Sequence, residues 1–244
     1  MFRSLLFRLR RAAIVGLTQL ALAGAALAQY QSPYIGLGAF VPQPGFALVM
    51  THAQRIAAAN VMKEAASASA RRTLPAAAVA APVASAAPPL SPYRPLSATD
   101  FKPAGLRNVA EEFAAQVRDP LQRAELIQLC RQILSTIEAT PGFRKNNLAS
   151  AATVLFGVSQ QVVSGQEFDE AQSEALMQLI NDDLVGSGAV AGWSRAQRTR
   201  AYDAMVITGG LIAGIAQNGA ETGNKEQVEQ ARRMAREALS NFGP

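Results

Sequence analysis

The sequence predicts an all-α protein, a small bundle of about five to six helices that follows a disordered linker rich in alanine and proline. Apolar residues recur at helical spacing beyond residue 98, side chains that start helices precede several of these runs, and proline interrupts the preceding stretch six times. We divide the chain into a signal peptide (1–28), an aromatic and proline-containing segment with a marginal helix (29–73), the linker (74–97) and the all-helical domain (98–244).

The first 28 residues have the order of a secretory signal peptide. Four arginines precede an uncharged run from Ala12 to Ala28, which closes on Ala26-Leu27-Ala28. Small residues at both recognition positions favour cleavage by signal peptidase. An uncleaved anchor is the alternative, because the run is at the lower edge of the length that spans a bilayer. We expect cleavage before Gln29 and a periplasmic or secreted protein.

The charge of the mature chain is close to neutral. The whole chain carries 23 Lys and Arg against 18 Asp and Glu, but four of the basic residues belong to the signal peptide. A basic protein would point to nucleic acid or an anionic membrane as partner. Without that excess we expect no nucleic-acid binding and no stable membrane insertion after signal cleavage.

Residues 29–73 combine scattered aromatic side chains with one predicted helix. Residues 47–72 are expected to form this helix, whose thin apolar face makes it marginal in isolation. The aromatic side chains before it are interrupted by prolines, which prevents a regular element but leaves them able to contact a partner: Tyr30, Tyr34, Phe40 and Phe46.

Two helices with clear boundaries open the folded domain. Asp119 before Pro120 predicts a helix start, and Pro141-Gly142 predicts its end near Thr140. Asn147 opens the next helix, which is apolar on nearly all sides and is closed by Gly165. A helix of that kind belongs in the middle of a bundle.

The last three helices begin with related capping signals. Asp169 and Gln172, Ser194 and Gln197, and Asn224 and Gln227 have the spacing at which two side chains satisfy each other's backbone N–H groups, although only the Ser194 pair fits the strict capping box. Glycines predict where the first two of these helices end, at Gly186 and Gly219, so the middle one is expected over residues 195–218.

Two glycines inside residues 195–218 predict a close helix crossing or an interface. Gly210 and Gly214 are four residues apart, so one helix face lets another backbone approach. We expect this face to pack inside the bundle against helix 147–164. The alternatives are an oligomer interface or a membrane-surface contact.

The residue inventory excludes most metal and nucleophile chemistry. The chain has one cysteine and one histidine, Cys130 and His52. Cys130 falls among apolar residues at helical spacing, which predicts a core position. We therefore expect no disulfide, no metal site, no cofactor and no catalytic residue of these types.

Asp203 is the carboxylate that the sequence singles out. It shares a helix face with apolar residues, so it is expected to be partly buried and to have a charged partner. Arg200 is the partner we favour, and Arg144 is the alternative. We interpret this pair as structural. An enzyme is the competing hypothesis and would need Asp203 to converge with a second carboxylate such as Glu167.

The domain resembles an uncharacterised family of exported proteins from Gram-negative bacteria with a C-terminal all-helical domain. The resemblance rests on three motifs and covers roughly residues 105–242. These are Asn146-Asn147-Leu148-Ala149, then Gly165-Gln166-Glu167 with Asp169 and Gln172, and Tyr202-Asp203-Ala204-Met205-Val206-Ile207-Thr208-Gly209-Gly210. It implies export and an all-helical fold and brings no activity, ligand or cofactor with it.

The leading functional interpretation is a non-catalytic interaction or structural module of the cell envelope. In this hypothesis the aromatic-bearing residues 29–62 contact a protein partner and are tethered to the domain by the linker. A homo-oligomer fits the same interpretation. A periplasmic enzyme and a membrane-surface protein are the alternatives.

Overall fold

The computed structural model describes residues 93–115 and 117–240, which contain six α-helices and one short 3-10 helix. The all-α prediction is confirmed for this part of the chain. The predicted signal peptide, the segment 29–73 and residues 74–92 of the predicted linker lie outside the described residues. The elements are η2 (Leu96–Thr99), α3 (Val109–Ala114), α4 (Pro120–Glu138), α5 (Leu148–Ser164), α6 (Glu170–Gly186), α7 (Arg195–Thr222) and α8 (Lys225–Ser240).

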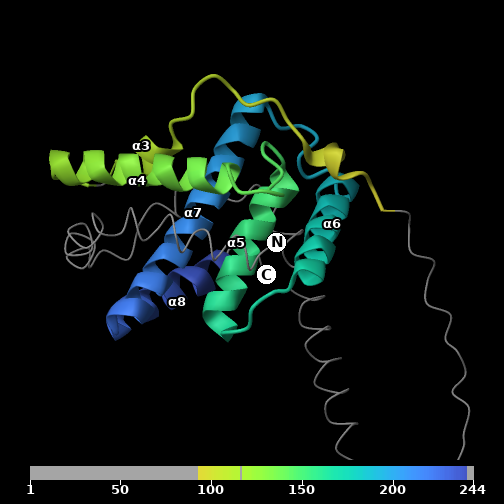
Figure 1. Ribbon diagram of the computed structural model, residues 1–244. Coiled ribbons are helices and arrows are strands. Elements are labelled where there is room, and N and C mark those ends of the chain that lie inside the picture. Colours follow the sequence, from red (N-terminus) through yellow and green to blue (C-terminus); the bar gives the residue numbers. More distant parts are fainter. Residues whose placement is uncertain (1–92, 116, 241–244) are drawn as a thin grey trace, which may run out of the picture.

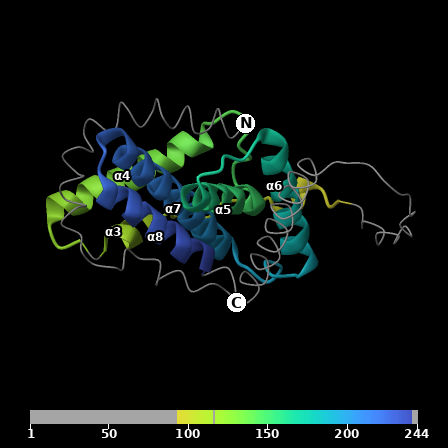
Figure 2. The same cartoon turned by 90° about the horizontal axis from the view of Figure 1, so that it is seen from below.

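Helix α5 is the centre of the domain. Its residues from Leu148 to Ser159 are all buried, and α6, α7 and α8 pack around it (Figures 1 and 2). The side chain of Asn147 caps its start, and Gly165 ends it in the left-handed conformation at φ 73°. Both predicted boundaries are confirmed. Because α5 has almost no polar face, only a central position buries it on every side.

Helix α4 crosses the upper end of α7 and packs against α7 and the short α3 (Figure 1). Asp119 accepts a hydrogen bond from the backbone N–H of Gln122, and Pro120 occupies the first turn, as predicted. Cys130 is fully buried in this helix, which confirms its predicted core position. Burial raises the pKa of its thiol to about 12, so it is not a reactive thiolate.

Two capping boxes form in full and the third is incomplete. Asp169 with Gln172 and Ser194 with Gln197 each satisfy both backbone groups. Asn224 accepts from the backbone N–H groups of residues 226 and 227, but the side-chain oxygen of Gln227 accepts from Asn218 instead. The third cap therefore joins α7 to α8.

The predicted end of helix 195–218 at Gly219 is wrong. Helix α7 continues to Thr222, and Gly223 takes the left-handed conformation that ends it, at φ 68°. Gly219 lies inside the helix, where its lack of a side chain lets α8 pack closely against α7. A Cβ at this position would stand 2.9 Å from Val228 of α8. Gly186 is the last residue of α6, as expected. Among the described helices, none has the length and apolar character needed to cross a membrane.

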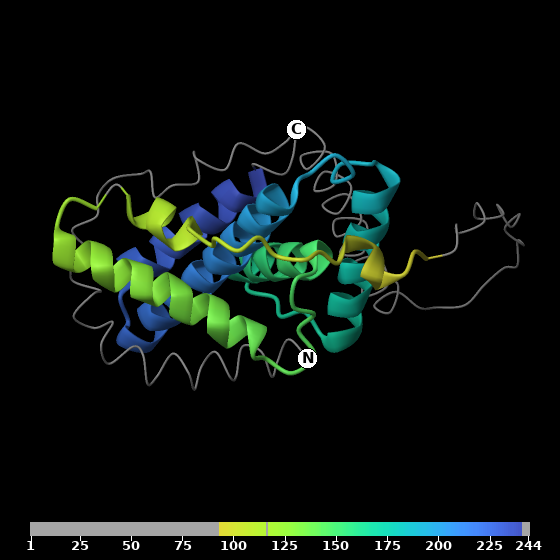
Figure 3. The same cartoon turned by 90° about the horizontal axis from the view of Figure 1, so that it is seen from above.

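Residues 93–104 form a strap that runs over the ends of α6 and α5 toward α7 (Figure 3). The amide group of Asn181, which is completely buried, donates to the carbonyl groups of Arg94 and Pro95, at 3.2 and 3.3 Å. Asn147 donates to the carbonyl of Leu96 at 2.8 Å, and Thr199 accepts from the N–H of Ala104 at 2.8 Å. Residues 93–97, which the sequence assigned to the linker, are thus bonded to the helical domain.

We expect a chain that starts at Ala98 to be less stable than one that starts at Tyr93. Removing residues 93–97 deprives the buried amide of Asn181 of its backbone acceptors, and a buried polar group left without a partner costs ~1–3 kcal/mol. Urea denaturation of the two chains measures the difference. Equal stability would mean that water replaces the strap at no cost.

Candidate functional site

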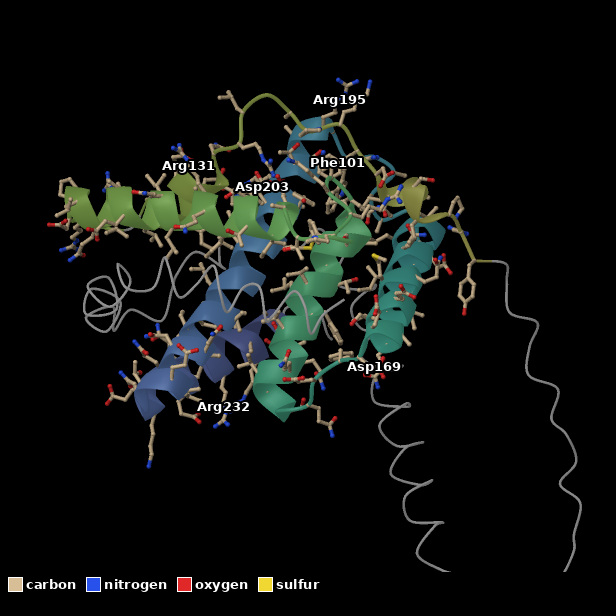
Figure 4. The ribbon with its side chains drawn as sticks, viewed as in Figure 1. Phe101, Arg131, Asp169, Arg195, Asp203 and Arg232 are labelled. Carbon is tan, nitrogen blue, oxygen red and sulfur yellow. The ribbon has the colours of Figure 1, made fainter. Side chains whose placement is uncertain are left out.

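The described residues bring their buried charges together at one place, beside the strap. We call this group the Arg107 cluster. It joins residues from the segment after the strap, the end of α4, the loop before α5 and the first half of α7. Figure 4 labels Asp203, the member on α7, and Phe101 of the strap nearby. Its members are Arg107, Glu138, Lys145, Tyr202 and Asp203.

Four of these residues form a continuous chain of ion pairs. Arg107 donates from Nε to both carboxylate oxygens of Asp203, at 3.1 and 3.0 Å, and its Nη2 also bonds to that carboxylate. The same Nη2 donates to Glu138 at 2.9 Å, and Lys145 Nζ lies 2.7 Å from the other Glu138 oxygen. Two acids and two bases therefore neutralise one another.

Burial decides how strongly these pairs matter. The side chain of Asp203 is 1% exposed and that of Glu138 is 9% exposed, whereas Arg107 is 29% exposed. A buried carboxylate needs a partner, because its charge is costly away from water. The fork of the arginine supplies two donors to one carboxylate, which is the strongest form of such a pair.

The pKa values of the two carboxyl groups shift in opposite directions, although burial acts on both in the same way. Burial raises the pKa of Asp203, because the bonds from Arg107 offset only part of the desolvation and Glu138 adds repulsion. Burial acts in the same direction on Glu138, but the hydrogen bonds from Lys145 and Arg107 outweigh it and lower the pKa of Glu138. Asp203 raises the pKa of Arg107, which stays charged.

Tyr202 forms the apolar floor of the cluster. Its ring lies 5.5 Å from that of Phe101 in an edge-on contact and 6.3 Å from that of Phe143, and the guanidinium of Arg107 stands 5.8 Å from the ring centre. Burial, with the nearby charge of Glu138, raises the pKa of Tyr202. The ring contacts show that this tyrosine serves packing and cation–π contact.

The lowered pKa of Glu138 predicts a loss of stability in acid. Its ionised form is favoured by folding, so the stabilisation is present above about pH 4.5 and disappears as the pH falls through the lower folded value. Asp203 has the opposite sign, since its raised pKa favours the protonated folded form. We expect Glu138→Gln to reduce the loss of stability between about pH 5 and 3. Urea midpoints at both pH values check this, and an unchanged difference would contradict it.

The structure confirms that Asp203 is buried and paired but corrects its partner. The sequence favoured Arg200, with Arg144 as the alternative. Arg200 donates instead to Glu112 at 2.8 Å, and Arg144 pairs with Asp100. Arg200 is three residues from Asp203, but its side chain lies on the surface and bonds to Glu112 of α3.

Sequence reasoning missed Arg107 altogether. It lies 96 positions from Asp203, in an irregular segment where no helical spacing marks which side chains point inward. A pair of this separation leaves no local pattern, and only the return of the strap over α7 creates it.

The glycines of α7 contact different neighbours from those expected. The predicted crossing of Gly210 and Gly214 against helix 147–164 is wrong in its partner, because a Cβ at Gly210 would stand 2.2 Å from Ile133 of α4. No described atom lies within 4 Å of such a Cβ at Gly214. The close approach to α5 occurs at Gly209, where Val154 and the backbone of Leu155 lie at 3.1 and 3.3 Å. Adjacent residues point about 100° apart, so Gly209 and Gly210 serve different helices.

The carboxylates proposed for an enzyme do not converge. Glu167 follows the end of α5, whereas Asp203 lies near its start; Figure 4 shows Asp169, two residues after Glu167, at the opposite end of the domain from Asp203. A helix of 17 residues separates the two ends by about 25 Å. No group of three metal-binding side chains exists among the described residues, and His52 lies outside them.

The comparisons with known proteins extend the resemblance inferred from residues 105–242. No curated protein and no solved structure matches the chain. One family profile matches residues 9–243, which includes the segment before the strap as well as the helical domain. That profile describes a family of unknown function, and the match covers nearly the whole chain. The chain therefore belongs to the family of unknown function DUF6683.

Proposed function

We propose that the protein is an exported, non-catalytic interaction or structural module of the cell envelope. The observation that carries this proposal is the mutual neutralisation of the Arg107 cluster. Its carboxylates bond to Arg107 and Lys145, at distances of 2.7 to 3.1 Å. A catalytic acid or base needs access to a substrate proton, whereas Asp203 is 1% exposed and held by two bonds from one guanidinium.

The other acidic doublets support the same proposal. Glu111 and Glu112 pair with Arg131 and Arg200, and Asp182 accepts from the backbone of Arg94. Asp169 caps α6. Carboxylates that already serve the fold leave contact with another molecule as the favoured role.

The proposed partner is a protein of the envelope that binds the aromatic residues within 29–62. The near-neutral mature charge argues against nucleic acid and anionic membranes as partners. Large aromatic side chains on an irregular segment bring apolar area together with a polar edge, which suits a protein interface. The helical domain would then act as the anchor of this segment or as a spacer.

The signal-peptide pattern predicts that the exported protein begins at Gln29. Intact-mass measurement of protein recovered from the envelope fraction of cells that make it should give the mass of residues 29–244. Full-length protein in the membrane fraction would contradict export with cleavage and would favour the uncleaved anchor.

Photo-crosslinking in cells tests the partner. A photoreactive amino acid at Tyr34 is expected to give one adduct of discrete mass, because this residue lies in the proposed contact segment. The matched control is Tyr93, a tyrosine that is 71% exposed at the beginning of the strap. Adducts at Tyr93 but none at Tyr34 would overturn the assignment of the contact segment, and none at either position would overturn the interaction module.

A further inference from the structure

Helix α4 is only partly covered by the described helices. Of its 19 residues only Cys130 and Ile137 are buried, and Leu121 is 70% exposed. Its helical neighbours are α7 and α3, which has six residues and is too short to cover its length. The large apolar residues of α4 are Leu121, Leu126, Ile127, Leu129, Ile133, Leu134 and Ile137.

The face of α7 that meets α4 continues past the end of the contact. Ile207 and Leu211 pack in a cluster with Cys130 of α4. Gly214 lies seven residues after Ile207 and therefore on the same face, but a Cβ there meets no described atom within 4 Å. In Figure 1, α4 and the C-terminal half of α7 run in different directions from their crossing.

These residues give an apolar face that α4, α7 and α8 share. We define the α4–α7 wedge by four half-buried residues. Three of them pack at the margin of the same cluster as Leu211, and the fourth is the open glycine: Leu126, Leu129, Met234 and Gly214. The wedge is thus apolar, with a glycine where another helix can approach closely.

We propose that the α4–α7 wedge is the docking site of the chain's own residues 47–72, which form a helix there. The family profile matches residues 9–243 as one unit, so the segment and the helical domain occur together in the family. The inference does not rest on the proposed envelope partner, since it leaves the aromatic residues 29–46 free to bind one.

The connection is long enough for this docking. About 20 residues lie between position 72 and the start of the strap, and a fully extended chain of that length spans up to about 70 Å. Helix α7, the longest helix described, has 28 residues and is about 42 Å long. The segment therefore reaches the wedge from the position of Tyr93 over either side of the domain.

The composition of residues 47–72 complements the wedge. The segment is rich in alanine, including Ala57, Ala58 and Ala59, so a helix formed by it has a narrow face. Small residues on one helix opposite a glycine on the other let two backbones approach. A helix with such a thin apolar face is marginal in water, and packing on an apolar surface supplies the stabilisation that it lacks.

Thiol labelling of the chain from Gln29 tests the docking. In Gly214→Cys the new thiol reports on the wedge, because the native Cys130 is completely buried. We expect Ala58→Pro, which breaks a helix over residues 47–72, to raise the maleimide labelling rate at position 214 about tenfold, which corresponds to ~1.4 kcal/mol of docking free energy. Ala78→Pro, in the proline-rich stretch, is the matched control and should leave the rate unchanged.

Hydrogen exchange in the chain with native Gly214 gives a second readout. Ala58→Pro should reduce protection in the first half of α4, and Ala78→Pro should not. Labelling and protection that are the same in both proline variants would overturn the proposal. A labelling rate that rises on dilution but ignores Ala58→Pro would overturn it in favour of a second copy of the chain in the wedge.

Discussion

Replacement of Asp203 by alanine is expected to lower the free energy of unfolding by ~3–5 kcal/mol, the usual cost of breaking a buried ion pair by removing one partner. The carboxylate is 1% exposed and accepts hydrogen bonds from both Nε and Nη2 of Arg107. Its loss leaves the guanidinium beside Tyr202 with one carboxylate partner, Glu138, at 2.9 Å. Urea denaturation followed by circular dichroism measures the change.

Glu112→Ala is the matched control for this prediction. Glu112 also pairs with an arginine, at 2.8 Å, but both side chains are substantially exposed. Exposed pairs contribute ~0–1 kcal/mol, so the control should change stability little. If Asp203→Ala and Glu112→Ala had the same small effect, the Arg107 cluster would not stabilise the fold, and a functional role for Asp203 would regain support.

Alanine at Gly210 and alanine at Gly214 are expected to have opposite effects on stability. At Gly210 the added methyl would stand 2.2 Å from the branched side chain of Ile133. The helix crossing must shift, which costs ~1–3 kcal/mol. At Gly214 a methyl has no described atom within 4 Å. In the chain that starts at Tyr93, which lacks residues 47–72, the better helix propensity of alanine should therefore stabilise the protein by ~0.5–1 kcal/mol.

The same denaturation measurement separates the two variants by sign. Both glycines lie inside the same helix, so the gain in helix propensity from Gly to Ala is the same at the two positions and the difference between the variants reports on packing. A stabilising Gly210→Ala would mean that α4 yields easily at the crossing. A destabilising Gly214→Ala would mean that its face is packed as tightly as the sequence suggested.

Features set by neighbouring residues could be predicted from the sequence. The starts of α4, α5, α6 and α7 depend on a side chain that bonds to the backbone three positions away, and all four were predicted. The central position of α5 follows from its lack of a polar face. The end of α7 was misplaced because Gly219 looks like a helix end locally, whereas its role is the close turn of α8.

Features set by distant residues could not be predicted. Arg107 meets Asp203 across 96 positions and Glu138 across 31, from a segment without regular structure. The first residues of the strap, 93–97, were assigned to the linker because they follow a stretch rich in alanine and proline, yet Asn147 and Asn181 bond to their backbone. In both cases the sequence shows the group that needs a partner, a carboxylate or an amide, but the partner itself is brought near only by the folded chain.

The central claim is that the Arg107 cluster is part of the packing of the fold, whereas contact with a partner performs the function. The double variant Arg107→Met with Asp203→Leu tests it most directly, because apolar replacement of a whole buried pair is often neutral for stability. We predict that this variant folds and still gives the Tyr34 photo-crosslinked adduct in cells. A variant that folds with the normal helical content but loses the adduct would contradict the claim and would place the Arg107 cluster in the function itself.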